Sequence, residues 1–302
     1  MIDGILIIDK PAGITSHDVV ARCRRILKTK KIGHTGTLDP FATGVVVILV
    51  GKATRLAQFL DKDAKEYEAI VRLGFETDTG DKTGELRITN YELRDVSSDE
   101  IEAVLPEFRG EIMQTPPMYS AKKVEGKKLY ELARKGIEIE RKAVKINIYA
   151  LELIDEKATD QKSKTEDRTI RVVCSAGTYI RVLAEDIGRK LKIGAHLAEL
   201  RRIRAGKFTL ETALTLEELE QKVADDELEN HIVPMSEAIS HLTEIKLTPE
   251  EIAKIKHGVK LCKDLNQTKP GDFLRLTDGT NLLAIGFYDE SEKTVQPKHV
   301  LV

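Results

Sequence analysis

The sequence has few of the residues that build disulfide frameworks or metal sites. Its 302 residues include no tryptophan and only three cysteines, Cys23, Cys174 and Cys262, an odd number at wide spacing. That pattern argues against a disulfide framework and against CxxC-type metal sites. The seven histidines show no HExxH-like spacing either. We therefore expect a reduced protein that holds no metal.

Long apolar runs and nucleotide-binding loops are missing as well. No apolar run reaches the roughly 18 residues that a membrane helix needs, and the N-terminal residues contain no basic region followed by an apolar stretch. Gly51 and Lys52 lack the spacing of a Walker loop, and no GxGxxG opens a helix. The sequence predicts a cytoplasmic protein without membrane contact or cofactor. Its 41% of hydrophobic residues still allow a sizeable core.

An excess of positive charge is also absent. The formal net charge is −2 and the isoelectric point is about 6.4, which taken alone argues against a nucleic-acid partner. The cations are nevertheless segregated into three stretches, and segregated charge can build a positive face on a neutral protein. An ordinary solvated surface is the alternative for any single stretch. The stretches hold Arg22, Arg24, Arg25, Lys28, Lys30 and Lys31; Lys122, Lys123, Lys127 and Lys128; and Arg201, Arg202, Arg204 and Lys207.

The most informative stretch that is present is GHTGTLDPFATG at residues 33–44. It combines a carboxylate and an imidazole with glycines, which let the backbone bend or approach a ligand closely. Pro40 biases Asp39 toward an extended conformation, and the apolar run at 45–50 predicts a buried strand. A polar loop held against a buried strand can fix a reactive side chain. An Asp-Pro turn without chemistry is the alternative.

Apolar runs and turn signals predict an α+β fold with a mixed, largely antiparallel central sheet flanked by helices. Strands are expected over residues 5–8, 45–50, 65–73, 144–153 and 169–174. We expect Ser16 to be the N-cap of a helix that runs to about Leu27, and a second helix over 178–191. Short strands near the C-terminus predict a small β-barrel-like module. The expected domains are residues 1–240 and 241–302.

Three residues in tight local contexts are candidates for chemistry. Asp39 lies in the glycine-rich loop, Arg181 near the start of an expected helix, and Tyr67 in an expected strand. An arginine beside an aspartate in a dry pocket is expected to lower the pKa of the acid and to keep it ionised as a nucleophile or base. A tyrosine above the same pocket can stack on a flat base. The alternatives are a surface ion pair for Arg181 and a core aromatic for Tyr67.

A second carboxylate is not obvious from the sequence. Glycoside hydrolysis needs two facing acids, and Asp39 has no acidic neighbour in its own loop. Asp78, Asp81 and Asp186 stay open as partners.

Over essentially its whole length the chain resembles the bacterial tRNA pseudouridine-55 synthases. Several long motifs in the same order make the resemblance more specific than one short pattern. They are DKPAGITS at 9–16, GHTGTLDP and ATG within 33–44, LG and TDT within 73–79, PPMYSAK at 116–122, GTYIR at 177–181 and LRR at 200–202. The resemblance implies the pseudouridine synthase fold and isomerisation of the T-loop uridine at position 55 of tRNA. In that reaction the N1–C1′ bond breaks and the uracil turns and rejoins through C5, without cofactor or metal.

The resemblance also implies roles for single residues. Asp39 is expected to be the catalytic carboxylate that attacks the flipped uridine or abstracts its proton, and Arg181 to pair with it. Tyr67 is expected to stack on the uracil and to take part in proton transfer, His34 to hold the nucleotide out of its loop, and Lys10 to support the site. The residues expected to contact substrate are Tyr179, Leu200, Arg201, Arg202 and Lys122.

The expected partner is tRNA, bound through its T-arm by a monomeric protein. A base inside folded RNA must be flipped out at a cost of a few kcal/mol, and the three cation-rich stretches would supply phosphate contacts. Residues 241–302 resemble the PUA module, which is expected to hold the acceptor end. Two alternatives remain open. One is the synthase subunit of guide-RNA particles, which has the same chemistry, and the other is an RNA chaperone that does not use the active site.

Overall fold

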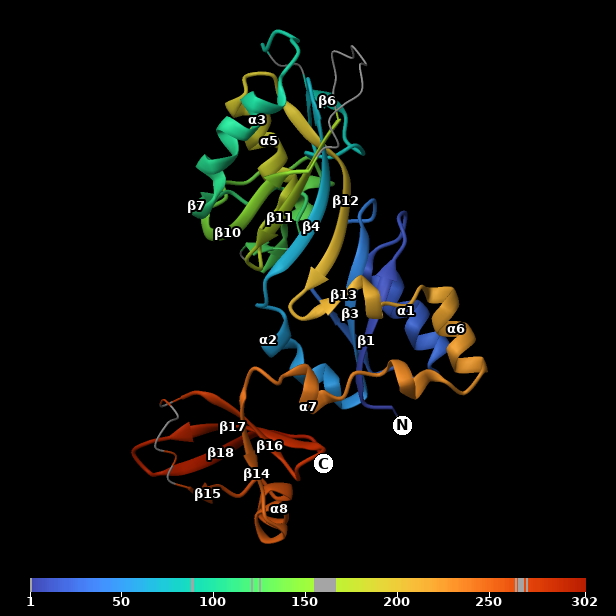
Figure 1. Ribbon diagram of the computed structural model, residues 1–302, viewed down its shortest axis with the longest axis vertical. Helices are drawn as coiled ribbons and strands as arrows, with labels where there is room; N and C mark the ends of the chain where they lie inside the picture. The colour runs from blue at the N-terminus through green and yellow to red at the C-terminus, as the bar shows by residue number, and fades with distance from the viewer. Residues whose placement is uncertain are drawn as a thin grey trace.

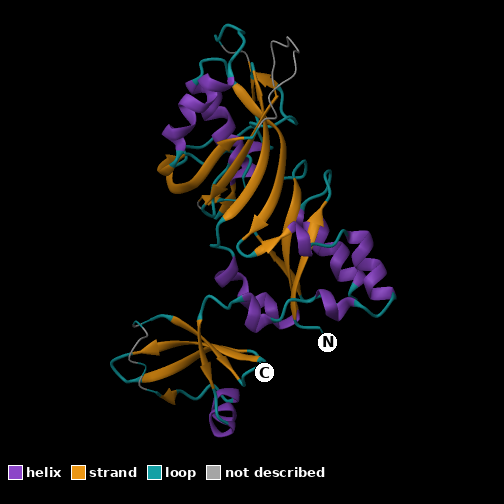
Figure 2. Cartoon of the chain, in the orientation of Figure 1, coloured by secondary structure: helices purple, strands orange, loops and turns teal. Residues whose placement is uncertain are grey.

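Two sheets, with helices α2 and α7 between them, organise the molecule (Figure 1). The structure is a computed structural model that describes residues 2–87, 90–120, 122–124, 126–154, 167–263, 265, 269 and 271–302. Helices lie against the larger sheet, and the smaller C-terminal sheet lies below it in Figure 2. The α+β class expected from the sequence is confirmed.

The larger sheet has nine strands among the described residues and is mixed but largely antiparallel. Its main path runs β1-β3-β12-β4-β11-β10-β7, with β2 paired to β3 and β13 paired to β12. The single parallel contact on this path joins β3 to β12, through Thr43↔Arg201 and Arg202↔Gly44. The strands are β1 (Gly4–Lys10), β2 (Ile32–Thr35), β3 (Thr43–Val50), β4 (Lys65–Leu73), β7 (Gly110–Gln114), β10 (Val144–Leu153), β11 (Asp167–Cys174), β12 (Ala195–Ala205) and β13 (Phe208–Thr209).

The two halves of this sheet differ in burial because their strands differ in pattern. In β1, Leu6 and Ile8 pack into one apolar core while Ile5 and Ile7 pack into a second core on the other face. The run in β3 divides in the same way, so both faces of this half are covered. In β4 the apolar residues alternate with charged ones, and only the set that includes Tyr67 faces a core. The other face of β4 carries Glu66, Glu68 and Arg72, with Ile70 as the one apolar residue among them.

Helices cover the core face of the sheet, and their ends follow from local chemistry. Helix α1 begins one residue earlier than expected: Thr15, not Ser16, is the N-cap, because its side chain accepts from the Asp18 backbone N–H in a capping box. The α-helices are α1 (Ser16–Ile26), α2 (Ala57–Leu60), α3 (Ser98–Val104), α4 (Leu129–Ala133), α5 (Ile180–Lys190), α6 (Leu216–Ala224), α7 (Met235–Ala238) and α8 (Pro249–Lys256). Short 3-10 helices are η1 (Gly51–Leu56), η2 (Leu105–Phe108), η3 (Leu210–Thr212) and η4 (Leu228–His231).

The C-terminal sheet is curled into a half-barrel, in the order β14-β16-β17-β18-β15. It carries its own core around Leu274 and Leu276. A further group that includes Ile285 and Leu301 packs into the core shared with β1 and β3. Its strands are β14 (Thr243–Lys246), β15 (Leu261–Cys262), β16 (Phe273–Thr277), β17 (Leu282–Asp289) and β18 (Thr294–Val300). The module is therefore packed against the rest of the chain through apolar contacts.

Two short hairpins complete the described part of the fold. They are β5 (Glu76–Thr77) with β6 (Leu86–Arg87), and β8 (Lys123–Val124) with β9 (Lys127–Lys128). Among the described residues, no helix is both long enough and apolar enough to cross a membrane.

Candidate active site

The loop that carries Asp39 joins β2 to β3, and hydrogen bonds hold it to α1 and to the turn between β1 and α1. The Leu38 backbone N–H donates to Ser16 Oγ at 2.9 Å, and Gly13 N–H donates to the Pro40 carbonyl at 2.8 Å. Ser16 and Leu38 are both buried. The backbone on both sides of Asp39 is therefore fixed by hydrogen bonds before any substrate arrives.

Lys10, at the end of β1, is fully buried beneath this loop. Its Nζ donates to the carbonyls of Pro11, Ile14 and Pro40 at 2.8, 2.7 and 3.2 Å. Burial lowers the pKa of Lys10 to about 8, with the charge of Asp39 acting against that shift. The three bonds use all the donors of an ammonium group. The side chain of Lys10 thus links the backbone of the loop, at Pro40, to the backbone of the turn before α1, at Pro11 and Ile14.

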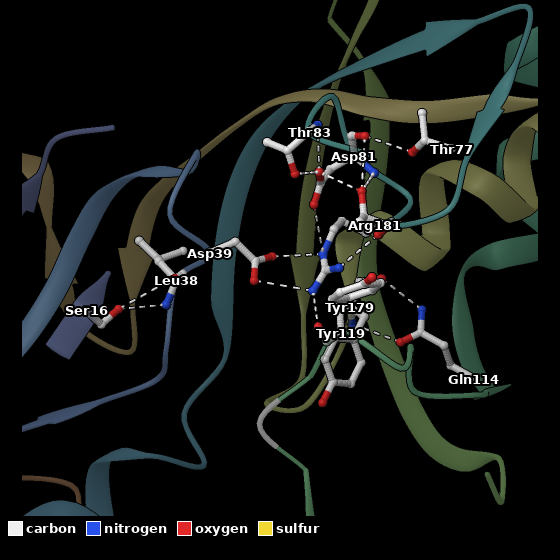
Figure 3. A network of polar contacts seen from close by, with 11 residues as sticks. Ser16, Leu38, Asp39, Thr77, Asp81, Thr83, Gln114, Tyr119, Tyr179 and Arg181 are labelled. Carbon is white, nitrogen blue, oxygen red and sulfur yellow. Dashed lines mark hydrogen bonds and ion pairs between the residues drawn. The ribbon is translucent and has the colours of Figure 1, made fainter. Parts of the chain in front are cut away.

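Arg181, on the first turn of α5, holds the carboxylate of Asp39 (Figure 3). Its Nε lies 2.9 Å from Asp39 Oδ2, and its Nη2 lies 3.3 Å from Oδ1. Nη1 also donates to the carbonyl of Thr79 at 2.9 Å, and Nη2 to that of Tyr119 at 2.7 Å. The side chain of Arg181 is 5% exposed and that of Asp39 is 34% exposed. A buried guanidinium with four of its five donors in use therefore orients a carboxylate that is still partly open.

Asp81, one of the three acids left open as partners of Asp39, is a second acid at this centre. Its Oδ2 lies 3.7 Å from Arg181 Nε, the same nitrogen that lies 2.9 Å from Asp39 Oδ2 (Figure 3). The carboxylate also accepts from Thr79 Oγ1, from Thr83 Oγ1 and from the Thr83 backbone N–H, at 2.9, 2.6 and 2.9 Å. Asp81 touches the arginine that holds Asp39, so the two carboxylates do not face each other across an open site.

The pKa of Asp39 is raised above its ordinary value, although Arg181 acts to lower it as expected. Burial is the first cause, and the charge of Asp81 adds to it. The charge and hydrogen bonds of Arg181 and the charge of Lys10 act in the opposite direction. Desolvation disfavours the charged form more than the ion pair favours it. Arg181 is therefore the group that keeps the carboxylate ionisable at a desolvated position.

Tyr67 and Arg202 lie in one register row across the sheet, next to Gly44 of β3. Tyr67 is buried, and burial raises the pKa of its phenol; the charges of both Arg202 and Asp39 act on it. Arg202 is 1% exposed, and it donates to the carbonyls of Val45 at 2.7 Å and Gly36 at 2.9 Å. Expected to contact substrate, Arg202 instead supports the catalytic loop from inside the sheet.

The neighbouring residue Arg201 points to the other face of β12. It forms an ion pair with Asp9, with Nη2–Oδ2 at 2.7 Å and Nη1–Oδ1 at 3.2 Å, and its side chain is 40% exposed. Arg201 and Leu200 line a cavity of about 270 Å³ together with Phe41, Thr43 and other residues. The cavity therefore adjoins the short parallel contact between β3 and β12.

His34 and Tyr179 lie on two sides of the loop. His34, from β2, contacts His17 of α1, with Nε2 and Nδ1 3.3 Å apart. Burial lowers the pKa of His34, and the charges of His17 and Arg202 lower it further. Tyr179 is the N-cap of α5, and its backbone N–H and carbonyl both bind the amide of Gln114, at 2.8 and 3.1 Å. Burial raises the pKa of its phenol.

The three cation-rich stretches differ in exposure. In the first, Arg24, Arg25, Lys28, Lys30 and Lys31 are exposed. In the third, Arg204 pairs with Glu66 at 2.7 Å and Lys207 with Glu237 at 3.7 Å. In the second, Lys122 is half-buried. The first stretch is therefore the one that most clearly presents positive charge to solvent.

The arrangement supplies one activated carboxylate, a fixed guanidinium and an aromatic ring at the same place. Asp39 and Arg181 are 142 residues apart in the chain, yet they make two polar contacts. Among the described residues, no group of three or more His, Cys, Asp or Glu side chains is arranged to hold a metal ion. The side chains are suited to nucleophilic or general-base chemistry by Asp39 itself.

Comparison with protein-family models gives two matches that follow one another along the chain. The model described as TruB family pseudouridylate synthase (N terminal domain) matches residues 24–180. The model described as tRNA pseudouridylate synthase B C-terminal domain matches residues 181–240. Asp39 and Tyr67 fall within the first match, and Arg181 is the first residue of the second.

Curated relatives match most of the chain. A protein named tRNA pseudouridine synthase B from Geobacillus thermodenitrificans is 46% identical over 259 residues, which cover 86% of this chain and 85% of that protein. A protein of the same name from Bacillus cereus is 42% identical over 303 residues, covering 99% of this chain and 97% of that protein. The similarity thus extends through the C-terminal half-barrel.

Solved structures with the same architecture are also similar. A chain in a crystal structure of a Cbf5–Nop10–Gar1 complex has a TM-score of 0.75 at 30% identity, with 99% of this chain and 85% of that chain covered. A chain in a structure of an H/ACA RNP bound to a substrate RNA containing 2′-deoxyuridine has a TM-score of 0.73 at 30% identity, with the same coverage.

Proposed function

Because this chain belongs to the TruB family of pseudouridylate synthases and is an isomerase that acts as a tRNA pseudouridine synthase, we propose that its substrate is the T-loop uridine at position 55 of tRNA. The uridine is flipped out of its loop and isomerised by Asp39. The bound partner is the T-arm, and the protein works without guide RNA.

The contact between Asp39 and Arg181 is the observation that carries this proposal. Four of the five N–H donors of the guanidinium are occupied, and the side chain is almost fully buried. The carboxylate that it holds is about one-third exposed (34%), so Asp39 is the part of the network that a substrate can reach. A buried, pre-organised partner fixes the orientation of a reactive group without any rearrangement during the reaction.

The isomerisation uses the ionised form of Asp39, as nucleophile or as base. The N1–C1′ bond of uridine breaks, the uracil turns, and C5 forms the new bond to C1′. The hydrogen on C5 leaves as a proton and N1 gains a proton, so the composition is unchanged. Burial raises the pKa of Tyr67, so its phenol stays protonated at neutral pH and acts as a stacking ring.

Binding of the RNA divides between phosphate contacts and base contacts. The exposed cations at residues 22–31 lie just before the β2 strand that leads into the catalytic loop. Their contacts to phosphates would position the T-arm without reading its sequence. His34 and Leu200 border the loop and the cavity beside it. Flipping the uridine costs a few kcal/mol, which these contacts offset.

We propose a domain boundary near residue 240, with residues 241–302 as a PUA-like RNA-binding module that holds the acceptor end. The separate core around Leu274 supports an independent module. The shared core that includes Leu301 supports a fixed orientation relative to the catalytic part. A fixed second site at a distance from the catalytic loop would measure the length of the stacked T and acceptor arms.

The similarity to Cbf5 chains favours a second candidate, a synthase subunit that needs guide RNA and partner proteins. The Cbf5 structures are 30% identical, whereas relatives named tRNA pseudouridine synthase B reach 46%. The higher identity supports a protein that acts alone on tRNA.

The test is mass mapping of an unmodified tRNA transcript incubated with the purified protein alone. We expect one pseudouridine, at position 55, and none in a transcript with cytidine at that position. Conversion only after addition of a guide RNA would support the second candidate. Conversion elsewhere in the tRNA would overturn the assignment of the T-loop uridine.

A further inference from the structure

The first turn of α1 contacts the catalytic loop at two points. One contact is to the backbone of the loop, and the other is to a side chain. Ser16 binds the backbone of Leu38, next to Asp39. The next residue, His17, reaches the ring of His34 at the start of the same loop. The centroids of the two imidazoles are 5.3 Å apart with planes at 72°, and His34 Nε2 lies 3.3 Å from His17 Nδ1.

We propose that His17 is a positioning residue for His34, which it holds by a ring-to-ring hydrogen bond in one orientation and one tautomer. The proposal rests on the function proposed above, which places His34 beside the flipped nucleotide. The capping box of α1 and the Ser16 contact fix the first turn of the helix, from which His17 projects. His17 therefore acts on the site through His34.

The chemistry of imidazole makes this contact directional. A neutral imidazole has one donor and one acceptor nitrogen, so the two facing nitrogens share a single proton. The other nitrogen of His34, Nδ1, is buried. Among the described residues Nδ1 has no hydrogen-bond partner, so the contact with His17 is the side-chain hydrogen bond that orients the ring. Without His17, Nε2 loses its partner and the ring is free to turn about its side-chain bonds.

The surrounding charges favour a neutral His34. Burial lowers its pKa, His17 and Arg202 lower it further, and Asp61 acts in the opposite direction. On the other side of the pair, His17 lies close enough to Asp18 for their charges to interact. A neutral ring in a fixed orientation can pack against a base. An imidazolium would attract any phosphate within reach, whatever its position in the tRNA.

The experiment compares His17→Ala with His17→Asn. Alanine removes both the charge and the hydrogen bond. Asparagine removes the charge but places an amide nitrogen or oxygen near the position of Nδ1. His231→Ala is the control, because His231 is a half-buried histidine at the end of η4, outside both the catalytic loop and the C-terminal module. Imidazole nitrogen shifts of 15N-histidine-labelled protein are measured without RNA, and single-turnover pseudouridine formation is measured against enzyme concentration.

We expect the nitrogen shifts to report one neutral tautomer of His34 in the wild-type protein and in His17→Asn, and an average of tautomers in His17→Ala. In both variants the pKa of His34 rises partway toward its ordinary value, because the charge of His17 is gone. The enzyme concentration for half-maximal rate rises about three- to tenfold in His17→Ala, the equivalent of one lost hydrogen bond, at an unchanged saturating rate. His17→Asn and His231→Ala stay near the wild-type value.

Unchanged His34 shifts in His17→Ala overturn the proposal, and so does a loss in saturating rate that asparagine does not restore. The two readouts also separate this proposal from the proposed function. If wild-type protein forms no pseudouridine, the function fails, while the nitrogen shifts still decide whether His17 holds His34.

Discussion

Two stretches that adjoin in the sequence, the cation-rich residues 22–31 and the catalytic loop at 33–44, rely on positive charge in opposite ways. Around the loop the cations are buried and donate to backbone carbonyls, as Lys10 does to three of them and Arg202 to two. In residues 22–31 most cations are exposed. The difference teaches that buried cations hold the backbone around Asp39, whereas the exposed ones are free to serve the RNA contacts proposed for them.

The largest effect is expected from Arg181→Lys, which keeps the charge but loses the planar fork. A lysine cannot bind both oxygens of Asp39 together with two carbonyls, so we expect the saturating single-turnover rate to fall about 100-fold. The control is Arg189→Lys, two turns further along α5, where the arginine binds Glu76. Equal rates for the two variants would show that Arg181 contributes only charge.

Arg202→Met tests the buried side of the comparison through stability. The carbonyls of Gly36 and Val45 lose their donor inside the protein, so we expect the free energy of unfolding to fall by about 2–4 kcal/mol. Arg201→Met, at a half-exposed ion pair, should cost less than about 1 kcal/mol. Denaturant unfolding measures both. Similar values would contradict the assignment of Arg202 to the support of the loop.

Lys10→Met removes the three hydrogen bonds beneath the loop and should lower the saturating single-turnover rate about tenfold.

The same lysine has a pKa of about 8 in the folded protein, below its ordinary value of 10.5. Between these pH values the unfolded chain binds more protons, so the wild-type stability rises with pH through that window. In Lys10→Met this rise should disappear, while Lys62→Met, at an exposed lysine, should retain it. The free energy of unfolding of the wild type and of both variants is measured by denaturant unfolding from pH 7 to 10.5.

The smallest effect per residue is expected from the exposed stretch. Replacement of Lys28, Lys30 and Lys31 by alanine should weaken tRNA binding severalfold at moderate salt and leave the saturating rate unchanged. The slope of log affinity against log salt should fall by about one for each lysine that meets a phosphate. A salt slope equal to that of the wild type would remove this stretch from the RNA interface.

The sequence predicted the reactive centre better than its surroundings, for physical reasons. Asp39, Arg181 and Lys10 stand in long motifs, and the structure brings all three together. Arg201 and Arg202 were expected to act alike, but adjacent residues of a strand point to opposite faces, so one is half-exposed and the other buried. Composition alone could not separate them, although the alternation along β12 carried the signal.

Contacts between segments explain most of what was missed. Asp81 lies in a short polar turn and was left open beside Asp78 and Asp186, because nothing local shows that its carboxylate lies 3.7 Å from Arg181 Nε. The pair of His17 and His34 depends on how α1 packs beside β2. Whether the pKa of Asp39 shifts up or down depends on how deeply the side chain is buried, which a sequence does not give. The N-cap of α1 was readable, since Thr15 and Asp18 have the spacing of a capping box.

The most direct test of the central claim is the saturating single-turnover rate of Asp39→Asn on the tRNA transcript, with tRNA affinity measured beside it. Asparagine keeps the size of the side chain and can accept one of the two Arg181 hydrogen bonds through its amide oxygen, but it cannot act as a carboxylate. We predict a loss in rate of at least about 1,000-fold with affinity within about twofold of the wild type. Pseudouridine formation by Asp39→Asn at a rate near that of the wild type would contradict the account.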